Sequence, residues 1–210
     1  MDDNIIPFRA ETLTPFYYHG LYVPDGSATH PDVLSDTALC FALAHAFGIP
    51  PARCLREKPD YRKDLRSIPW RASLSTGENN RNIAPVRHII DVDREGGNSV
   101  RMQKNMASGF FKKTFYVHEV APGALYHGII IGPDPFRMTH TDEVIIRIGV
   151  GRLGIVRLTK DKPRDNYRLN AATGRLFGCA LSEESRILDT IRFSFPYSPA
   201  EAKEILSTWR

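Results

Sequence analysis

Apolar residues at strand-like and helix-like spacing predict one strand and one helix near the start of the chain. Residues 5–14, IIPFRAETLT, alternate as a strand does, with a proline near the start, where a strand tolerates it. Residues 32–48, DVLSDTALCFALAHAFG, carry an apolar face at helical spacing and end on Gly48, which suits a helix C-terminal cap. We expect a strand, a long loop and then the main helix, with His45 as a partly buried structural residue of that helix.

The pattern in the rest of the chain is mostly that of strands. The runs FFKKTFYVHEV and ALYHGIIIG are separated by APG and predict a central hairpin. The pieces RSIPWRASL and IAPVRHIIDVD are joined by the polar turn STGENNRN, which favours a second hairpin or an irregular insertion. Residues 133–143, PDPFRMTHTDE, predict a polar connection to a further pair of strands over residues 143–159. Ser198, Pro199 and Glu201 fit a capping box and predict a short terminal helix.

These elements predict an α+β fold in one elaborated domain over residues 1–210. An insertion is expected at about residues 60–113 and a C-terminal extension at about residues 165–210. The chain is 42% hydrophobic and 25% charged, contains no apolar run of membrane-spanning length and starts without a secretory pattern. We therefore expect a cytoplasmic protein without membrane contact. Trp70 and Trp209 are expected to be packing residues.

Positive charge is concentrated in two parts of the chain. Residues 147–175 hold eight Lys and Arg against two Asp, and residues 60–113 hold eleven Lys and Arg against six Asp and Glu, while the whole chain carries only +4. A surface that serves solubility alone would more often mix its signs. The separation predicts a basic face for nucleic acid.

The glycine-arginine stretch RIGVGRLG is the strongest candidate for binding an anionic backbone. Gly149, Gly151 and Gly154 permit positive φ and close approach of a ligand to peptide N–H groups, and the side chains of Arg147, Arg152 and Arg157 can contact phosphate. The spacing imitates a dinucleotide fingerprint, but the β-prone run IVRLT follows it where a cofactor site needs a helix. A plain hairpin turn with solvated arginines stays the alternative.

Aromatic and basic side chains alternate in two other segments, which suits single-stranded RNA. Most of these rings are expected to pack in the core, and strand alternation allows at most half of the second group to face a ligand. The interleaved residues are Tyr17, Tyr18, His19, Tyr22, Phe110, Phe111, Lys112, Lys113, Phe115 and Tyr116.

The succession FYYHGLYVPDG, SDTALCFALAHAFG and VIIRIGVGRLGIVRL resembles the RAMP superfamily of CRISPR-associated RNA-binding proteins over roughly residues 8–160. Within that superfamily it is similar to the subunit that caps the five-prime handle of guide RNA in class 1, Cascade-like effector complexes, nearest to the type I-D form. The resemblance implies a ferredoxin-like, RRM-like fold with an inserted β-hairpin thumb and a short C-terminal helix. The segment after Arg164 has no counterpart in the family.

The resemblance also implies function, partners and site residues. The chain would be a non-catalytic subunit for antiviral and anti-plasmid interference, bound to guide RNA (crRNA) and to the backbone and large subunits, with contact to the flanking motif of target DNA left open. The glycine turn with Arg147 and Arg152 would hold RNA phosphates, and a thumb loop would close over the guide. That loop is expected around Arg101, Gln103 and Lys104, with Lys112, Lys113, Tyr18 and His19 as further RNA contacts.

Two other functions stay open. A metal-independent endoribonuclease that processes CRISPR repeat RNA would use His88, His118 or His127 as general acid or base. A purely structural subunit would leave both basic clusters unexplained. The sequence has no metal-binding spacing, its three cysteines form no CxxC pair, and no GxSxG motif occurs. We therefore expect no metal and no cofactor.

Overall fold

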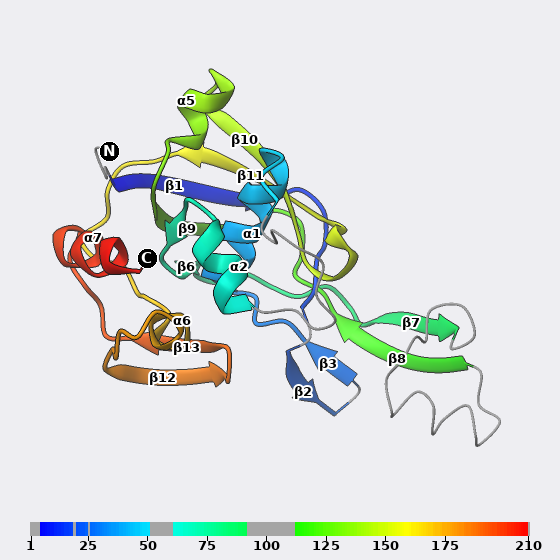
Figure 1. Ribbon diagram of the computed structural model, residues 1–210. Coiled ribbons are helices and arrows are strands. Elements are labelled where there is room, and N and C mark those ends of the chain that lie inside the picture. The colour runs from blue at the N-terminus through cyan, green and yellow to red at the C-terminus, as the bar shows by residue number, and fades with distance from the viewer. Residues whose placement is uncertain (1–4, 19, 25, 51–60, 92–111, 210) are drawn as a thin grey trace.

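A computed structural model gives the fold of the chain (Figure 1). The residues that it describes are 5–18, 20–24, 26–50, 61–91 and 112–209, and the side chains of residues 61, 62, 89–91 and 112–115 lie outside this description. None of the helices among these residues has the length and apolar character needed to cross a membrane.

A seven-stranded sheet forms the centre of the molecule, in the order β10-β11-β1-β9-β6-β4, with β5 also paired to β9. Every pair of neighbours in it is antiparallel. The strands are β1 (Ile5–Thr12), β4 (Val33–Leu34), β5 (Arg71–Ala72), β6 (Ser75–Thr76), β9 (Leu125–Ile131), β10 (Glu143–Ile148) and β11 (Gly154–Lys160).

The order of the central strands is that of a ferredoxin-like fold. Helix α1 (Asp36–Ala46) connects β1 to β5 and β6, and the short helix α5 (Pro135–Thr139) connects β9 to β10 and β11. The run β11-β1-β9-β6 therefore places the fourth, first, third and second strands of a β-α-β-β-α-β unit side by side. The prediction of an α+β, ferredoxin-like fold is confirmed, with β10 added at one edge.

The two faces of the sheet bury different parts of the chain because successive strand residues point to opposite sides. One face packs against α1 and α2 (Tyr61–Ser67) around Phe8, Leu43 and Trp70. On β9 the alternate residues Ile129 and Ile131 belong to a second cluster, built mainly from C-terminal residues: Tyr167, Leu169, Ala202, Leu206 and Trp209. Both tryptophans are buried, as expected.

A smaller four-stranded sheet extends from the main body at the lower right of Figure 1. Its strands are β2 (Leu21–Val23), β3 (Gly26–Ala28), β7 (Val86–Asp91) and β8 (Lys112–His118). Strands β7 and β8 pair antiparallel from Val86↔Val117 to Asp91↔Lys112, and β3 runs parallel to β8.

The C-terminal segment forms a separate region at the left of Figure 1. It contains α6 (Ala171–Leu176), the hairpin of β12 (Glu183–Leu188) and β13 (Ile191–Ser194), and α7 (Pro199–Thr208). The predicted capping box of α7 is confirmed, since Ser198 and Glu201 bond reciprocally to each other's backbone N–H.

Two expectations about strand pairing were wrong. The runs FFKKTFYVHEV and ALYHGIIIG do not form a central hairpin: β8 pairs with β7 and β3, while β9 pairs with β1, β5 and β6. Of the two alternatives for RSIPWRASL and IAPVRHIIDVD, the hairpin is wrong, because the first segment supplies β5 of the main sheet and the second supplies β7. Turn residues indicate where a chain reverses but do not say which strand will be the neighbour.

Three helices were missed within the described residues. A part of the expected insertion forms α2, the expected polar connection after residue 132 contains α5, and the C-terminal extension contains α6. Asp134 caps α5 by accepting hydrogen bonds from the N–H groups of Phe136 and Arg137, and Pro135 follows at the first helical position. This Asp-Pro pattern was the available signal for a helix start.

Candidate nucleic-acid interface

The turn between β10 and β11 has an unusual backbone that the glycines make possible. Gly149 has φ 80°, Gly151 has φ 65°, and the 3-10 helix η1 (Val150–Arg152) lies within the turn. A Cβ at Gly149 would lie 3.0 Å from the carbonyl oxygen of Tyr17. Arg152 itself has φ 56°, a conformation that non-glycine residues adopt at a cost.

Gly154 has a packing role in addition to its place in the motif. It is buried, and a Cβ there would lie 2.4 Å from Cβ of Phe16. The absence of a side chain lets the first residue of β11 lie directly against the Phe16 segment. Any ligand at the turn would meet Gly149, Gly151 and the arginines before it met Gly154.

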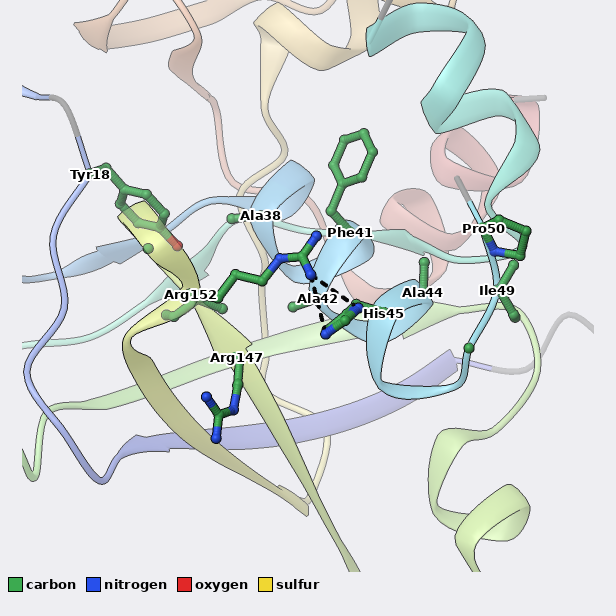
Figure 2. Close-up of a pocket in the computed structure, with 13 residues that line it drawn as sticks. Tyr18, Ala38, Phe41, Ala42, Ala44, His45, Ile49, Pro50, Arg147 and Arg152 are labelled. Atoms are coloured by element: carbon green, nitrogen blue, oxygen red, sulfur yellow. Dashed lines mark hydrogen bonds between the residues drawn. The ribbon is translucent and has the colours of Figure 1, made fainter. Parts of the chain in front are cut away.

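Arg152 points from the turn toward the C-terminal end of α1 (Figure 2). Its Nη1 lies 3.2 Å from both ring nitrogens of His45. A guanidinium can only donate, so this hydrogen bond forms with a neutral imidazole, which has one nitrogen free to accept. His45 is exposed, which corrects the expectation of a partly buried residue.

Arg147 points the other way. On β10 the residues Val144, Ile146 and Ile148 are buried, while Glu143, Ile145 and Arg147 alternate with them and are exposed. In Figure 2 the Arg147 guanidinium points away from the Arg152–His45 pair. The guanidinium groups of the two arginines expected to act together therefore point in different directions, although both residues border the cavity described next.

A cavity of about 400 Å³ lies between α1 and the turn. Its wall on the helix side is apolar, from Ala38, Phe41, Ala42 and Ala44, and Ile49 and Pro50 continue it after the helix. Its polar side chains are His45 from the last turn of α1 and, from the segments opposite the helix, Tyr18, Arg147 and Arg152. A concave, mostly apolar site with a few convergent polar groups is typical of ligand pockets.

Tyr18 lines this cavity, and its hydroxyl is buried. Within the described part of the chain the hydroxyl has no hydrogen-bond partner, and burial, with a smaller contribution from Tyr126, raises its pKa, so the group stays protonated. Its backbone is held on both sides by Thr29, whose hydroxyl accepts from the Tyr18 N–H at 2.8 Å and donates to the Tyr18 carbonyl at 3.1 Å. The ring is thus fixed in place while its polar end is unsatisfied.

Residues 16–18 connect the glycine-arginine turn to the root of the β7–β8 hairpin. The Tyr17 carbonyl accepts a hydrogen bond of 2.9 Å from the N–H of Val150 in the turn. The Tyr17 ring lies against His88 of β7, with ring centroids 5.1 Å apart. Two basic regions that are far apart in the sequence therefore meet at one short segment.

The β7–β8 hairpin carries basic and aromatic side chains on one face. Arg87 and Tyr116 are cross-strand partners, and both are exposed. Tyr22 on β2 is the most exposed large apolar side chain of the described residues, at 95%. Lys112 and Lys113 lie in β8, at the end of the hairpin away from the main sheet, and their side chains lie outside the description. His19, Arg101, Gln103 and Lys104 also lie outside the described residues.

Arg157 is paired within the sheet. Its Nη2 lies 2.7 Å from Oε2 of Glu11 across the β1–β11 pair, and this hydrogen bond raises the pKa of Arg157. The arginine is half-buried, and its charge is matched locally. Of the predicted phosphate contacts, Arg147 and Arg152 are therefore better placed than Arg157 to meet an external anion.

The histidines considered for catalysis have different surroundings. His127 Nδ1 lies 2.7 Å from Asp161 Oδ2, and His88 Nε2 lies 3.3 Å from Glu119 Oε1. Partial burial raises the pKa of Asp161, but hydrogen bonds from His127 and the Lys162 N–H outweigh this effect and lower it. Among the residues that the structure describes, no three His, Cys, Asp or Glu side chains come close enough to hold a metal ion.

His45 and the small residues of α1 were not recognised as part of the candidate site. Ala38, Ala42 and His45 follow one another at i, i+4 and i+7, so they share one stripe of the helix. This spacing was visible and was assigned to the core. The small side chains and the histidine were the signal that the stripe is only partly covered.

Neither a family model nor a curated protein matches the chain. Among solved structures, the chain is similar to one in the cryo-EM structure of the type III-B Cmr-beta bound to cognate target RNA and AMPPnP. The two are 9% identical with a TM-score of 0.41, over 78% of this chain and 67% of the other. A likeness of this size does not define a family, a substrate or a partner for this chain.

Proposed function

We propose that the chain is a non-catalytic RNA-binding subunit of a CRISPR effector complex. It binds the five-prime handle of the guide RNA along the surface from the β10–β11 turn to the β7–β8 hairpin, and it caps the filament of backbone subunits. The large subunit would be a further neighbour. The family itself is part of the proposal and rests on the sequence resemblance together with the ferredoxin-like strand order.

The meeting of the two basic regions at residues 16–18 carries the proposal. The hydrogen bond from Val150 to Tyr17 and the contact of Tyr17 with His88 hold the turn and the hairpin root together. Arg147 and Arg152 flank one side of this segment, and Arg87 lies on the hairpin at the other. Cations on both sides of one segment, together with the exposed ring of Tyr116, suit the sugar-phosphate backbone of a single strand.

The open part of the main sheet is a less suitable surface for RNA. An RRM-like domain binds bases on aromatic residues of its two central strands. On the corresponding face here, β1 presents Ile5, Pro7, Arg9 and Glu11, and β9 presents Leu125, His127, Ile129 and Ile131, without an aromatic ring. Ile129 and Ile131 are moreover covered by the C-terminal segment. These facts support a site at the turn and hairpin instead.

The test is RNA binding by a double variant with Arg147→Ala and Arg152→Ala. We expect weaker binding of single-stranded RNA and a salt dependence that is shallower by about 0.7 in slope for each phosphate that an arginine no longer neutralises. Arg137→Ala is the matched control, because Arg137 is an exposed arginine of α5 outside this surface. A double variant with the affinity and salt slope of the control would contradict the proposed surface.

Assembly is tested by co-expression of the chain with the products of its genomic neighbours. The proposal expects a larger complex that contains a uniform short RNA, and the double variant should reduce the RNA recovered with it. Recovery of the complex with undiminished RNA would favour a purely structural subunit.

One observation favours a second candidate function, metal-independent cleavage of repeat RNA. The Asp161 carboxylate holds His127 through Nδ1, which leaves Nε2 as the nitrogen that could exchange a proton with a substrate. Incubation of the free chain with repeat RNA and a chelator tests this function. Cleavage that is lost in His127→Ala would support the endoribonuclease, and intact RNA would support the binding subunit.

A further inference from the structure

The cavity beside the glycine-arginine turn has the size and lining of a site for one flat, partly polar ligand. Ala38 and Ala42 lie one turn apart on α1, and neither side chain extends beyond Cβ, so the helix offers a shallow wall. Phe41 and Ile49 add apolar surface beside it. A volume of about 400 Å³ lies within the range of small-molecule pockets.

The polar groups of the cavity are of two kinds. At the mouth, the Arg152 guanidinium donates to the ring of His45, and no carboxylate of the described residues is paired with it. Tyr18 lines the wall; its hydroxyl is buried without a partner among the described residues, and its backbone is held by Thr29. A buried hydroxyl without a hydrogen bond is unfavourable until a ligand atom satisfies it.

We infer that this cavity takes one unpaired nucleobase, whose phosphate contacts Arg152 and whose polar edge reaches the Tyr18 hydroxyl. The inference deepens the proposed function and rests on it, because the base would belong to the bound RNA. Charge complementarity selects the ligand class: an apolar wall suits a base, and an unmatched arginine at the mouth suits its phosphate. A free nucleotide has the same chemistry and is the other source of such a ligand.

The cavity can be filled without changing the charges around it. Ala38 is only partly buried, so Ala38→Leu places a larger side chain into the cavity while the fold is retained. Ala46→Leu is the matched control, since Ala46 is an exposed residue of the same helix outside the cavity lining. Thermal unfolding of both variants checks that the helix is intact.

The decisive measurement compares a short single-stranded RNA with the same RNA made abasic, by fluorescence anisotropy at fixed salt. We expect Ala38→Leu to lower the affinity for RNA with bases by about tenfold, the effect of unstacking one base, and to leave the affinity for abasic RNA unchanged. Ala46→Leu should bind both as the unaltered protein does. An equal effect of Ala38→Leu on both RNAs, or no effect on either, would overturn the inference.

Two further experiments distinguish a failure of this inference from a failure of the proposed function on which it rests. If the unaltered protein binds no RNA, the proposed function fails, and a titration with adenosine, guanosine, cytidine and uridine monophosphates then tests the cavity alone. Binding of a monophosphate that Ala38→Leu abolishes would support the cavity with a free nucleotide as its ligand, and no binding would overturn it. Within RNA, Tyr18→Phe should reduce the preference among the four bases, and an unchanged preference would overturn the role of the hydroxyl.

Discussion

Two regions with polar groups beside α1 differ in how well these groups are satisfied by hydrogen bonds. At the start of α1, the fully buried Asn170 donates to Asp36 Oδ1 at 2.8 Å and to the Thr190 carbonyl at 2.9 Å, and it accepts from the N–H groups of Ala172 and Arg192. In the cavity beside α1, the Tyr18 hydroxyl has no partner among the described residues, and Arg152 of the β10–β11 turn adopts a left-handed backbone.

The difference separates a region that stabilises the fold from one that is available for a ligand. Asn170 joins the first turn of α1 to the C-terminal segment, and its side-chain amide is satisfied on both its oxygen and its nitrogen. Within the described residues, the cavity region keeps an unsatisfied hydroxyl, a strained residue and an arginine whose side chain contacts a histidine and no carboxylate. Local strain and unpaired polar groups concentrate at functional sites because selection there acts on binding as well as stability.

The largest expected effect comes from removal of the Asn170 side chain. Asn170→Ala removes one hydrogen bond from the buried Asp36 carboxylate and the acceptor of two partly buried backbone N–H groups, so we expect a decrease of about 3 kcal/mol in the free energy of unfolding. Chemical denaturation measures it. RNA affinity of the folded fraction should be unchanged, and a decrease below about 1 kcal/mol would mean that water replaces these hydrogen bonds.

A pair of tyrosine variants tests the comparison more directly. The Tyr126 hydroxyl donates to the Pro31 carbonyl at 2.6 Å, so Tyr126→Phe should cost about 1–2 kcal/mol of stability. Tyr18→Phe removes a hydroxyl without a partner and should cost nothing measurable, or should stabilise the protein. Equal destabilisation by the two variants, measured by denaturant titration, would contradict the view that Tyr18 is unsatisfied.

Replacement of Arg152 by glycine should stabilise the protein and weaken its RNA binding. Because its φ is 56°, Arg152→Gly is expected to raise the free energy of unfolding by about 0.5–1 kcal/mol while it weakens RNA binding. Arg152→Ala is the matched control, because it removes the same charge but keeps a side chain at the strained position. The two variants should bind RNA equally weakly and differ in thermal midpoint, and identical midpoints would argue against strain.

The smallest effect is a pH dependence at the His127–Asp161 pair, which is only partly buried. The pKa of Asp161 is lower in the folded protein than its ordinary value of 3.8, so its contribution to stability is complete above that pH and is lost as the pH falls below it. For a pair this exposed we expect less than about 1 kcal/mol. Asp161→Asn should flatten stability curves in this acid range, and a curve as steep as that of the unaltered protein would exclude this pair as the cause.

The local elements were predicted where each depends on neighbours in the sequence. The first strand, the strands around the glycine-arginine turn and the capping box at Ser198 have the expected places, and the main helix ends before Gly48 as expected. It starts later than expected, because Val33 and Leu34 form β4. Capping and alternation act over a few residues, so their sequence signals are nearly complete. The partners of β5, β7, β8 and β9 depend on long-range packing, which turn residues do not encode.

The candidate site was predicted in part for the same reason. Gly149, Gly151 and Arg152 were found because glycines, which permit positive φ, and clustered basic residues can be recognised in the sequence. His45 was not, since its contact with Arg152 joins residues 107 positions apart. The direction of Arg147 follows from strand alternation on β10, whereas that of Arg152 follows from the left-handed conformation of the turn. Composition does not predict this turn conformation.

The amino-acid sequence was sufficient for the class of fold, the concentration of positive charge and the position of the glycine-arginine turn, because these follow from composition and short-range periodicity. Three-dimensional packing was needed to bring the turn, residues 16–18 and the β7–β8 hairpin together and to open a cavity against α1. Packing also covered part of the sheet with the C-terminal segment. Each of these outcomes depends on contacts between residues far apart in the chain. The energies of such contacts are set by shape and burial, and no short stretch of sequence indicates them.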